Sequence, residues 1–344
     1  MENITIHISI PMGLTSLEDQ IRNSEVGKHV AFVTIKTFSN PATHEAYSPD
    51  LEDPAIARQV QYLFADTPLI ARYWRSLPAL KWVHTQRNGV DLVIDSLKKN
   101  EAPPFILTKT PGDLNSSFIT EYVLGYIIAM NRKIFEARES QSRKDWQQRP
   151  LLCNQNIAEC TVGILGIGEI GKHIAKACKV LGLHVWGMTR TEHVVNNKCE
   201  SIDVYRTRDH LQEVLENSDY IVCVLPSTPS TRNLLSGGVL EACKRKNTVL
   251  INVGRGDIID EDSIVQAISN GWLGGAVLDV FPIEPLPVSS PLWDLPGVVI
   301  TPHTSGWSAS PEFLAGIIKV YTDNIQRYIT GQPLENVLDW QQGY

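Results

Sequence analysis

The stretch Thr161-Val162-Gly163-Ile164-Leu165-Gly166-Ile167-Gly168-Glu169-Ile170-Gly171 decides how this chain folds. Its first five residues are mostly apolar or β-branched, which indicates a buried strand, and helical spacing follows from Glu169 to Leu181. Between them, Gly166 permits a tight turn, Gly168 lets backbone N–H groups approach a pyrophosphate, and Gly171 allows helix and strand to pack closely. Such glycines also occur in purely structural turns, but the strand before and the helix after favour a dinucleotide-binding turn that includes Glu169 and Ile170.

Short apolar runs of strand length recur on both sides of this motif. Because stretches long enough for helices separate them, the pattern predicts an α/β protein with two doubly wound parallel sheets. The first series comprises Ile4–Ile10, Val30–Ile35, Gln61–Phe64, Lys81–Thr85 and Phe105–Thr108. The second series comprises Thr161–Leu165, His184–Met188, Tyr220–Leu225, Thr248–Asn252, Gly275–Leu278 and Val298–Thr301.

Two helical segments set the expected domain boundaries. Ser116–Arg132 has apolar residues at helical spacing on more than one side, which is typical of a helix buried between domains or subunits. Pro311–Ile329 is amphipathic and follows the second sheet, so we expect it to pack back on the first domain. We therefore predict a discontinuous domain of residues 1–113 and 307–344, a dinucleotide-binding domain of residues 114–306, and a cleft between them.

Composition and charge argue against several classes of protein. The chain has 344 residues and a formal charge of −7, which disfavours binding to nucleic acid or acidic membranes. No apolar run reaches the ~20 residues that span a bilayer, and the N-terminus lacks the pattern of a secretory signal. The six scattered cysteines form no C-x-x-C pair, so we interpret them as buried thiols rather than disulfides or metal ligands. These features predict a cytoplasmic protein without a metal site.

The end of the second strand after Cys160 indicates which dinucleotide is bound. An Asp or Glu at this position accepts hydrogen bonds from the 2′-hydroxyl of NAD. Here the strand ends in Thr189-Arg190-Thr191, with no acid. A guanidinium can hold a 2′-phosphate through charge-assisted hydrogen bonds, with the threonines as further donors, so NADP(H) is favoured over NAD(H). In the alternative interpretation, Arg190 is an ordinary surface arginine of an enzyme that accepts both cofactors.

Four later segments each follow a predicted strand, and the carboxyl ends of parallel strands meet at one edge, where ligands bind. These segments are Leu225-Pro226-Ser227-Thr228-Pro229, Asn252-Val253-Gly254-Arg255-Gly256, Leu278-Asp279-Val280-Phe281-Pro282-Ile283-Glu284-Pro285 and Thr301-Pro302-His303-Thr304-Ser305-Gly306. They bring a cation, two carboxylates and an imidazole to the same edge. Taken singly, Arg255 could be an exposed arginine, Glu284 a solvated loop acid, and His303 a capping or core histidine. Because all three follow predicted strands at the same sheet edge, we favour a catalytic role for the set.

From about Ser116 to Gly306 these motifs resemble the D-isomer-specific 2-hydroxyacid dehydrogenase family, in particular its glyoxylate/hydroxypyruvate reductases. The resemblance implies a Rossmann cofactor domain and a flavodoxin-like substrate domain. It also implies that Arg255 binds the substrate carboxylate, that His303 donates the proton, and that Glu284 pairs with His303. The cofactor site it implies at the strand ends comprises Leu225, Pro226, Val253, Gly254, Arg255, Asp279, His303 and Gly306.

Elementary chemistry agrees with these roles. Reduction of a ketone by hydride leaves an alkoxide that must be protonated as it forms, and an imidazolium can supply that proton near neutral pH. A nearby carboxylate such as Glu284 stabilises the imidazolium and fixes its tautomer. The planar fork of Arg255 matches the substrate carboxylate and can hold the keto group in line with the hydride.

The loop Gln86-Arg87-Asn88-Gly89-Val90-Asp91 departs from the family pattern, in which small residues come before the G-V-D-like turn that holds the carboxylate. Gly89 can still serve that purpose. Arg87 and Asn88 are larger and polar, and two interpretations stay open: they bind a second acidic or hydroxyl group of the substrate, or they face solvent. Trp146 and Trp307 either wall the substrate pocket or serve in packing and subunit contacts.

We therefore predict an oxidoreductase that transfers a hydride between NADP(H) and a small 2-keto/D-2-hydroxy acid pair, and that forms a homodimer through the apolar Ser116–Arg132 helix. One alternative is a formate- or phosphite-type dehydrogenase of the same fold. The formate branch pairs its histidine with a glutamine, and Glu284 argues against it. The other alternative is a dinucleotide-sensing scaffold similar to the family's transcriptional corepressors, which can retain the catalytic residues.

Overall fold

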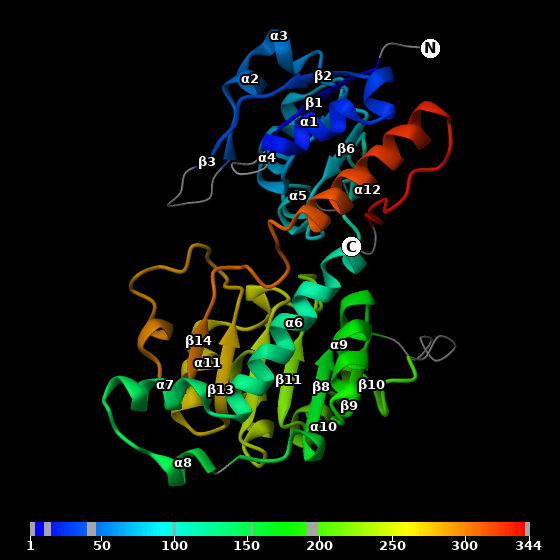
Figure 1. Ribbon diagram of the computed structural model, residues 1–344. Coiled ribbons are helices and arrows are strands. Elements are labelled where there is room, and N and C mark those ends of the chain that lie inside the picture. The colour runs from blue at the N-terminus through cyan, green and yellow to red at the C-terminus, as the bar shows by residue number, and fades with distance from the viewer. Residues whose placement is uncertain are drawn as a thin grey trace. The chain divides into compact units, whose positions relative to one another are not determined.

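The computed structural model describes residues 4–9, 15–39, 46–98, 101–152, 154–190 and 199–340. The chain folds into two compact units: unit 1 comprises residues 1–114 and 308–344, and unit 2 comprises residues 115–307. Each unit is built around a parallel β-sheet, which confirms the predicted fold class. In Figure 1 unit 2 runs from turquoise to orange. Among the helices of the described ranges, none is long and apolar enough to cross a membrane.

Unit 1 contains a five-stranded parallel sheet with the order β2-β1-β5-β6-β7. This is the flavodoxin-like order, in which the direction of winding reverses beside the first strand. Its strands are β1 (Thr5–Ile8), β2 (Ala31–Thr34), β5 (Tyr62–Phe64), β6 (Trp82–Thr85) and β7 (Ile106–Lys109). Its helices are α1 (Thr15–Asn23), α2 (Pro49–Glu52), α3 (Pro54–Ala57), α4 (Thr67–Tyr73), α5 (Asp91–Asp95) and α12 (Pro311–Ile329). A short antiparallel hairpin of β3 (Phe38–Ser39) and β4 (Ala46–Tyr47) was not expected from the sequence.

Helix α12 covers one face of the unit 1 sheet. Tyr321 of this helix stacks on Phe64 of β5 with the ring centroids 4.2 Å apart, and Tyr328 stacks on Trp82 of β6 at 5.3 Å. Side chains of the opposite strand face, such as Leu63, pack with α4 in a separate apolar cluster. Since Tyr321 is only 1% exposed, the core of unit 1 includes a helix that follows unit 2 in the chain.

Unit 2 contains a seven-stranded parallel sheet with the order β10-β9-β8-β11-β12-β13-β14. The order reverses beside β8, as in the Rossmann fold. Its strands are β8 (Thr161–Leu165), β9 (His184–Thr189), β10 (Val204–Thr207), β11 (Tyr220–Cys223), β12 (Thr248–Asn252), β13 (Leu273–Leu278) and β14 (Val298–Ile300). Its helices are α7 (Ile134–Ser142), α8 (Gln148–Leu152), α9 (Glu169–Val180), α10 (Leu211–Asn217) and α11 (Glu261–Ser269), and α6 (Gly112–Asn131) enters it at residue 115.

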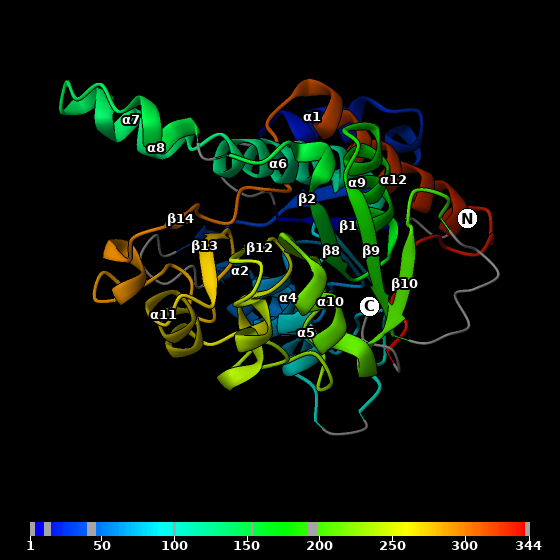
Figure 2. The same cartoon turned by 90° about the horizontal axis from the view of Figure 1, so that it is seen from below.

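Alternating side chains give the unit 2 sheet two apolar faces. Val222 and Ile251 pack with α6 and α9, whereas Cys223 and Leu250 pack with α10 and α11. Figure 2 shows the two pairs of helices on opposite sides of the strands. The carboxyl ends of the strands are thereby left for connecting loops, which is where the chemistry-bearing motifs lie.

The described cysteines follow the expectation of buried thiols with one exception. All five are free thiols, and all are buried except Cys199, which is half-buried. Burial raises the pKa of the Cys178 and Cys223 thiols to about 12, so these groups stay protonated near neutral pH. Cys153 lies outside the described residues.

Candidate active site

The glycine turn after β8 has a separate steric reason for each glycine. Gly166 has a φ of +107°, a backbone conformation that side chains rarely adopt. A Cβ at Gly171 would lie 2.1 Å from the carbonyl oxygen of Gly166, so the first turn of α9 can approach β8 only without a side chain there. A Cβ at Gly168 would meet nothing within 4 Å, which leaves that side of the turn open.

The N-terminus of α9 suits the pyrophosphate of a dinucleotide. Gly168 is the N-cap residue and no side chain caps the helix. The first N–H groups of the helix, at Glu169, Ile170 and Gly171, have no intrahelical partner. They form the positive end of the helix dipole, which attracts an anion. The side chain of Glu169 is occupied with Lys172, whose Nζ lies 3.0 Å from Oε1. The residues present at this turn therefore fit the cofactor that the motif predicts.

The carboxyl ends of β9 and β10 carry two arginines. Thr189 pairs with Thr207 in the parallel ladder, and Arg190 and Arg208 directly follow these two residues. Both arginines are exposed. Arg208 could not be predicted as a site residue, because the strand before it, β10, was not predicted. Thr191, the third residue predicted for this end of the cofactor site, lies outside the described residues.

Two close backbone contacts hold the segment that carries Arg255. A Cβ at Gly254 would lie 2.7 Å from the carbonyl oxygen of Leu225, and a Cβ at Gly256 would lie 1.9 Å from the carbonyl carbon of Phe281. The glycines on both sides of Arg255 therefore bring its backbone against the Leu225-Pro226 turn and against the segment that leads to Glu284. The guanidinium also donates from Nη1 to the carbonyl oxygen of Gly254 at 2.6 Å.

Glu284 and His303 form a hydrogen-bonded pair. Nδ1 of His303 lies 2.7 Å from Oε2 of Glu284, and the backbone N–H of Phe281 donates to Oε1 at 2.9 Å. Burial by itself raises the pKa of Glu284. The hydrogen bond and charge of His303, together with the Phe281 N–H and the charge of Arg255, outweigh burial and hold this pKa below its usual value. Because an ionised carboxylate can only accept, Nδ1 carries a proton, and Nε2 is the ring nitrogen left for a substrate.

Asp279 holds the loop on which His303 stands. This aspartate is fully buried, and its Oδ1 accepts from the Thr301 hydroxyl at 2.6 Å and from the Thr304 N–H at 2.8 Å. Its Oδ2 accepts from the Ser305 N–H at 3.0 Å. Farther along the loop, the carbonyl oxygen of Gly306 accepts from Asn115 of α6 at 2.6 Å. The predicted contacts of Asp279, Val253 and Gly306 with the cofactor stay predictions, and the structure shows that Asp279 also positions the acid loop.

The residues of the predicted substrate loop, Arg87, Asn88 and Gly89, belong to unit 1. Arg87 donates from Nε to both carboxylate oxygens of Asp66, at 2.7 and 2.9 Å. Nζ of Lys109 donates to Oδ1 of Asn88 at 3.1 Å. Neither partner could be predicted from the sequence. Trp307 belongs to unit 2, where its backbone N–H donates to the carbonyl oxygen of Thr304 at 3.3 Å.

A Rossmann sheet with a glycine turn, and a histidine–glutamate pair beside an arginine at its strand ends, define a nicotinamide-dependent dehydrogenase. Residues 124–305 match the family described as D-isomer specific 2-hydroxyacid dehydrogenase, NAD binding domain. The chain belongs to this family of oxidoreductases.

Three comparisons illustrate the relationship. A glycerate dehydrogenase from Methylorubrum extorquens is 29% identical over 321 residues, which cover 89% of this chain and 95% of that protein. A glyoxylate/hydroxypyruvate reductase B from Serratia proteamaculans is 31% identical over 78% of this chain and 81% of its own length. An NADPH-dependent glyoxylate/hydroxypyruvate reductase from Sinorhizobium meliloti, solved with NADP and sulfate, superposes with a TM-score of 0.79 at 25% identity, covering 99% of this chain and 100% of that chain. These relatives favour neither the scaffold nor the formate- or phosphite-type alternative.

Proposed function

We propose that this chain is an NADPH-preferring reductase of small 2-keto acids of the glyoxylate and hydroxypyruvate type, producing D-2-hydroxy acids. The observation that carries the proposal is the 2.7 Å contact between Nδ1 of His303 and Oε2 of Glu284, on the loops that also adjoin Arg255. The two reductases named above support the substrate class, since they share the fold and much of the length of this chain.

Each site residue has one task in this reaction. The bound dinucleotide supplies the hydride. The Arg255 guanidinium binds the substrate carboxylate and orients the keto group. His303 donates the proton from Nε2 to the forming alkoxide, while Glu284 orients the imidazole by accepting the hydrogen bond of Nδ1. The backbone contacts at Gly254 and Gly256 keep Arg255 from moving independently of the segment that carries Glu284.

The preference for NADPH is supported by the end of the site that receives the adenosine ribose. Arg190 and Arg208 follow neighbouring strands at the same edge, and no acid ends β9. Two exposed guanidinium groups attract a 2′-phosphate, whereas the 2′-hydroxyl of NAD gains little from them. The structure solved with NADP agrees with this preference.

A panel of 2-keto acids assayed with NADPH and with NADH tests the proposal. We expect turnover of glyoxylate or hydroxypyruvate with NADPH at a kcat/KM at least about tenfold above that with NADH. His303→Gln serves as the matched inactive variant, because it keeps a polar side chain of similar size. Absence of turnover with every keto acid, in protein that binds NADPH, would contradict the proposed activity.

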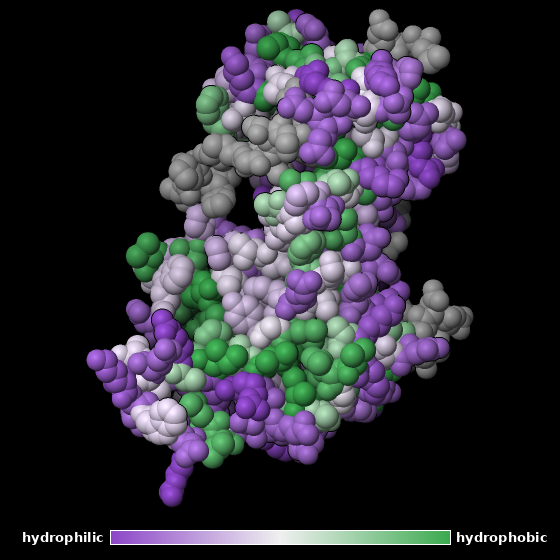
Figure 3. Space-filling view, viewed as in Figure 1, coloured by the Kyte–Doolittle hydropathy of each residue, from purple (hydrophilic) through white to green (hydrophobic). Residues whose placement is uncertain are grey.

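We also propose that the protein forms a homodimer through unit 2. Figure 3 shows hydrophobic residues gathered over α6 and its surroundings. Helices α7 and α8 lie at the margin of unit 2 in both Figure 1 and Figure 2, and their segment bears Trp146, 91% exposed, and Leu152, 67% exposed. An apolar margin of this kind is typical of a surface covered by another copy of the chain.

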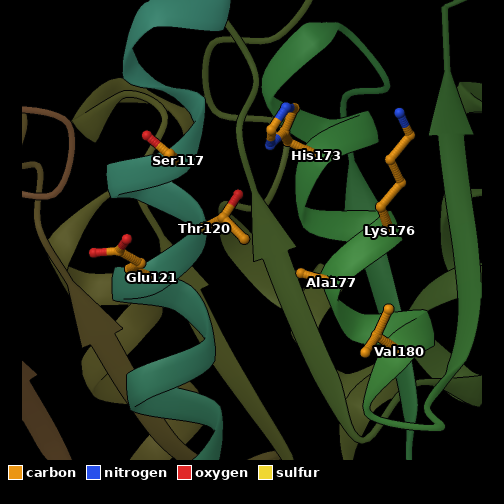
Figure 4. Close-up of a pocket in the computed structure, with 7 residues that line it drawn as sticks. All are labelled: Ser117, Thr120, Glu121, His173, Lys176, Ala177 and Val180. Carbon is orange, nitrogen blue, oxygen red and sulfur yellow. The ribbon is translucent and has the colours of Figure 1, made fainter.

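A groove between α6 and α9 supports the same interface. Figure 4 shows Thr120 of α6 facing α9 across this groove, whose volume is about 370 Å³. Oγ1 of Thr120 is buried without a hydrogen-bond partner in the described residues, and Val180 at the far end of α9 is strongly exposed. A second copy would cover Val180 and could supply the missing partner for Thr120. Sedimentation of the wild type and of the double variant Trp146→Ser/Leu152→Ser tests this interface. We expect the wild type to be a dimer and the double variant to dissociate more readily. A monomeric wild type would contradict the proposal.

The thiols support a cytoplasmic location as a further part of this proposal. Cys178 and Cys223 are buried and unpaired, and secreted proteins of an oxidising compartment usually carry disulfides. Fractionation of the source cells, with the protein followed by antibody, tests the location.

A further inference from the structure

Helix α6 contacts the loop of residues 301–306, which carries His303, at both of its ends. Oη of Tyr122 lies 2.6 Å from Oγ1 of Thr301, the first residue of the loop. Nδ2 of Asn115 donates to the carbonyl oxygen of Gly306, the last residue, at 2.6 Å. Asn115 and Tyr122 are about two helical turns apart, so they lie on the same face of α6. All of these residues belong to unit 2.

The same face of α6 packs closely on the end of the loop. A Cβ at Gly306 would lie 3.1 Å from Cδ1 of Ile119, a residue that is 7% exposed. Between the two tethered ends, Pro302, His303 and Thr304 are exposed. An exposed segment is held by few packing contacts, so the position of the imidazole depends on how the ends of the loop are held.

The hydrogen bonds that lead from Tyr122 to Asp279 have a fixed direction. The carboxylate of Asp279 accepts from the Thr301 hydroxyl at 2.6 Å. Because a hydroxyl has a single proton, Thr301 can only accept from Tyr122, and Tyr122 is the donor. Burial raises the pKa of Tyr122, which keeps this donor protonated. The three side chains therefore form a chain of hydrogen bonds from α6 to the buried acid that holds the loop.

We propose that Tyr122 and Asn115 are positioning residues for keto-acid reduction: from one face of α6 they fix the two ends of the loop on which the proton donor, His303, stands. This inference rests on the proposed function and deepens it. Neither residue takes part in proton transfer. Their contribution is to keep the imidazole within reach of the forming alkoxide.

Substrate binding should depend little on these contacts. Arg255, the proposed ligand of the substrate carboxylate, stands on a separate segment, which is held by the close backbone contacts of Gly254 and Gly256. Displacement of the imidazole should therefore lower kcat much more than it changes KM, because proton donation requires the acid within hydrogen-bond reach. A hydrogen bond that merely stabilised the fold would act differently: its loss would lower the stability of the protein and leave kcat unchanged.

Single substitutions remove or keep each polar group. In Tyr122→Phe we expect kcat for reduction of glyoxylate or hydroxypyruvate with NADPH to fall about 3- to 10-fold, with less than about a 2-fold change in KM for the keto acid. Thr301→Val has a similar shape without the hydroxyl and should lower kcat at least as far. Thr301→Ser keeps the hydroxyl and should retain most of the wild-type kcat. Asn115→Ala releases the other end of the loop and should act in the same direction as Tyr122→Phe.

The double variant Tyr122→Phe/Thr301→Val tests whether the two hydroxyls act as one chain. We expect its kcat to match that of Thr301→Val alone, because the hydrogen bond from Tyr122 is already lost in the single variant. Tyr220→Phe is the matched control. Tyr220 is 6% exposed, belongs to the apolar cluster that α6 packs against, and begins β11 at the amino end of the strands, so this variant should keep the wild-type kcat.

The possible outcomes separate this inference from the proposed function. Wild-type kcat in Tyr122→Phe and Thr301→Val, with or without a loss of stability, would overturn the positioning role while leaving the reductase activity intact. A loss in Thr301→Ser as large as that in Thr301→Val would overturn it as well, since the hydroxyl would then not matter. A wild type that binds NADPH but reduces no keto acid would instead overturn the proposed function and this inference with it.

Discussion

The backbone N–H of His303 donates a hydrogen bond to the carbonyl oxygen of Asp279 at 2.9 Å, so the acid loop is joined by its main chain to the end of β13. His303 has a φ of +54°, a conformation that non-glycine residues adopt at some cost. The three further hydrogen bonds that the Asp279 carboxylate accepts from this loop maintain that conformation. The hydrogen bonds to the buried Asp279 thus offset the conformational cost at His303.

Removal of the imidazole should abolish proton donation without removing the dinucleotide site. In His303→Ala we expect kcat for keto-acid reduction to fall by about 10²- to 10⁴-fold, the usual contribution of a general acid. Fluorescence titration should show that NADPH still binds. The exposed His29→Ala is a matched control. A fully active His303→Ala variant would overturn the assignment of the proton donor.

Replacement of Glu284 by glutamine should slow proton donation, because Nδ1 of His303 would lose the carboxylate that accepts its hydrogen bond at 2.7 Å. We expect kcat for keto-acid reduction to fall by about 10-fold or more, with little change in NADPH binding. Initial rates at pH 7 and a fluorescence titration with NADPH measure the two effects. A variant as active as the wild type would show that Glu284 does not assist His303.

The same carboxylate predicts a pH-dependent difference in stability. The folded-state pKa of Glu284 lies below its usual value of 4.5. Its contribution to the free energy of unfolding is therefore present above pH 4.5 and is lost as the pH falls through the lower folded value. Urea unfolding of the wild type and Glu284→Gln should differ more at pH 7 than at about pH 3. A difference that does not change with pH would contradict the shift.

Loss of the Arg190 guanidinium should affect one dinucleotide more than the other. In Arg190→Ala we expect kcat/KM for NADPH to fall about 10- to 100-fold, because charge-assisted hydrogen bonds to the 2′-phosphate are lost, with a smaller change for NADH. Arg208→Ala should act in the same direction, and Arg58→Ala should leave both cofactors unaffected. Equal losses for the two dinucleotides would remove Arg190 from 2′-phosphate recognition.

A single methyl group in the glycine turn should be costly. In Gly171→Ala the Cβ would lie 2.1 Å from the carbonyl oxygen of Gly166, so β8 and α9 must move apart. We expect a loss of about 1–3 kcal/mol in the free energy of unfolding, together with weaker dinucleotide binding. Gly238→Ala is the matched control, since its Cβ would meet nothing within 4 Å. Identical unfolding curves for the two variants would contradict the steric argument.

Periodicity predicted the strands well wherever they are apolar and buried. The bounds of β8 and β12 are those expected, because Thr161–Leu165 and Thr248–Asn252 are apolar runs with clear polar or glycine ends. The edge strand β10 (Val204–Thr207) was missed: its residues are half-buried, and Tyr205 and Arg206 do not stand out as a strand. The neighbouring Arg208 was missed with it.

Motifs indicated the residues that we propose as catalytic, but the sequence could not reveal the hydrogen-bond partners of the site residues. The pair of Arg87 and Asp66 joins the ends of two neighbouring strands, and a pairing across strands depends on register that no local pattern encodes. The loop-holding role of Asp279 was hidden for the same reason, since its partners Thr301, Thr304 and Ser305 follow the next strand. Such contacts are decided by tertiary structure.

The place of α12 in unit 1 has a consequence for synthesis on the ribosome. Tyr321 completes an aromatic stack with Phe64, yet more than two hundred residues, including all of unit 2, are translated between them. Unit 2 is one continuous stretch and can fold as soon as it emerges from the ribosome. The strands of unit 1 are translated first, but their core is complete only after α12 has been translated. Until then no aromatic ring of α12 packs on Phe64 and Trp82, and the nascent chain exposes an aromatic surface that chaperones recognise.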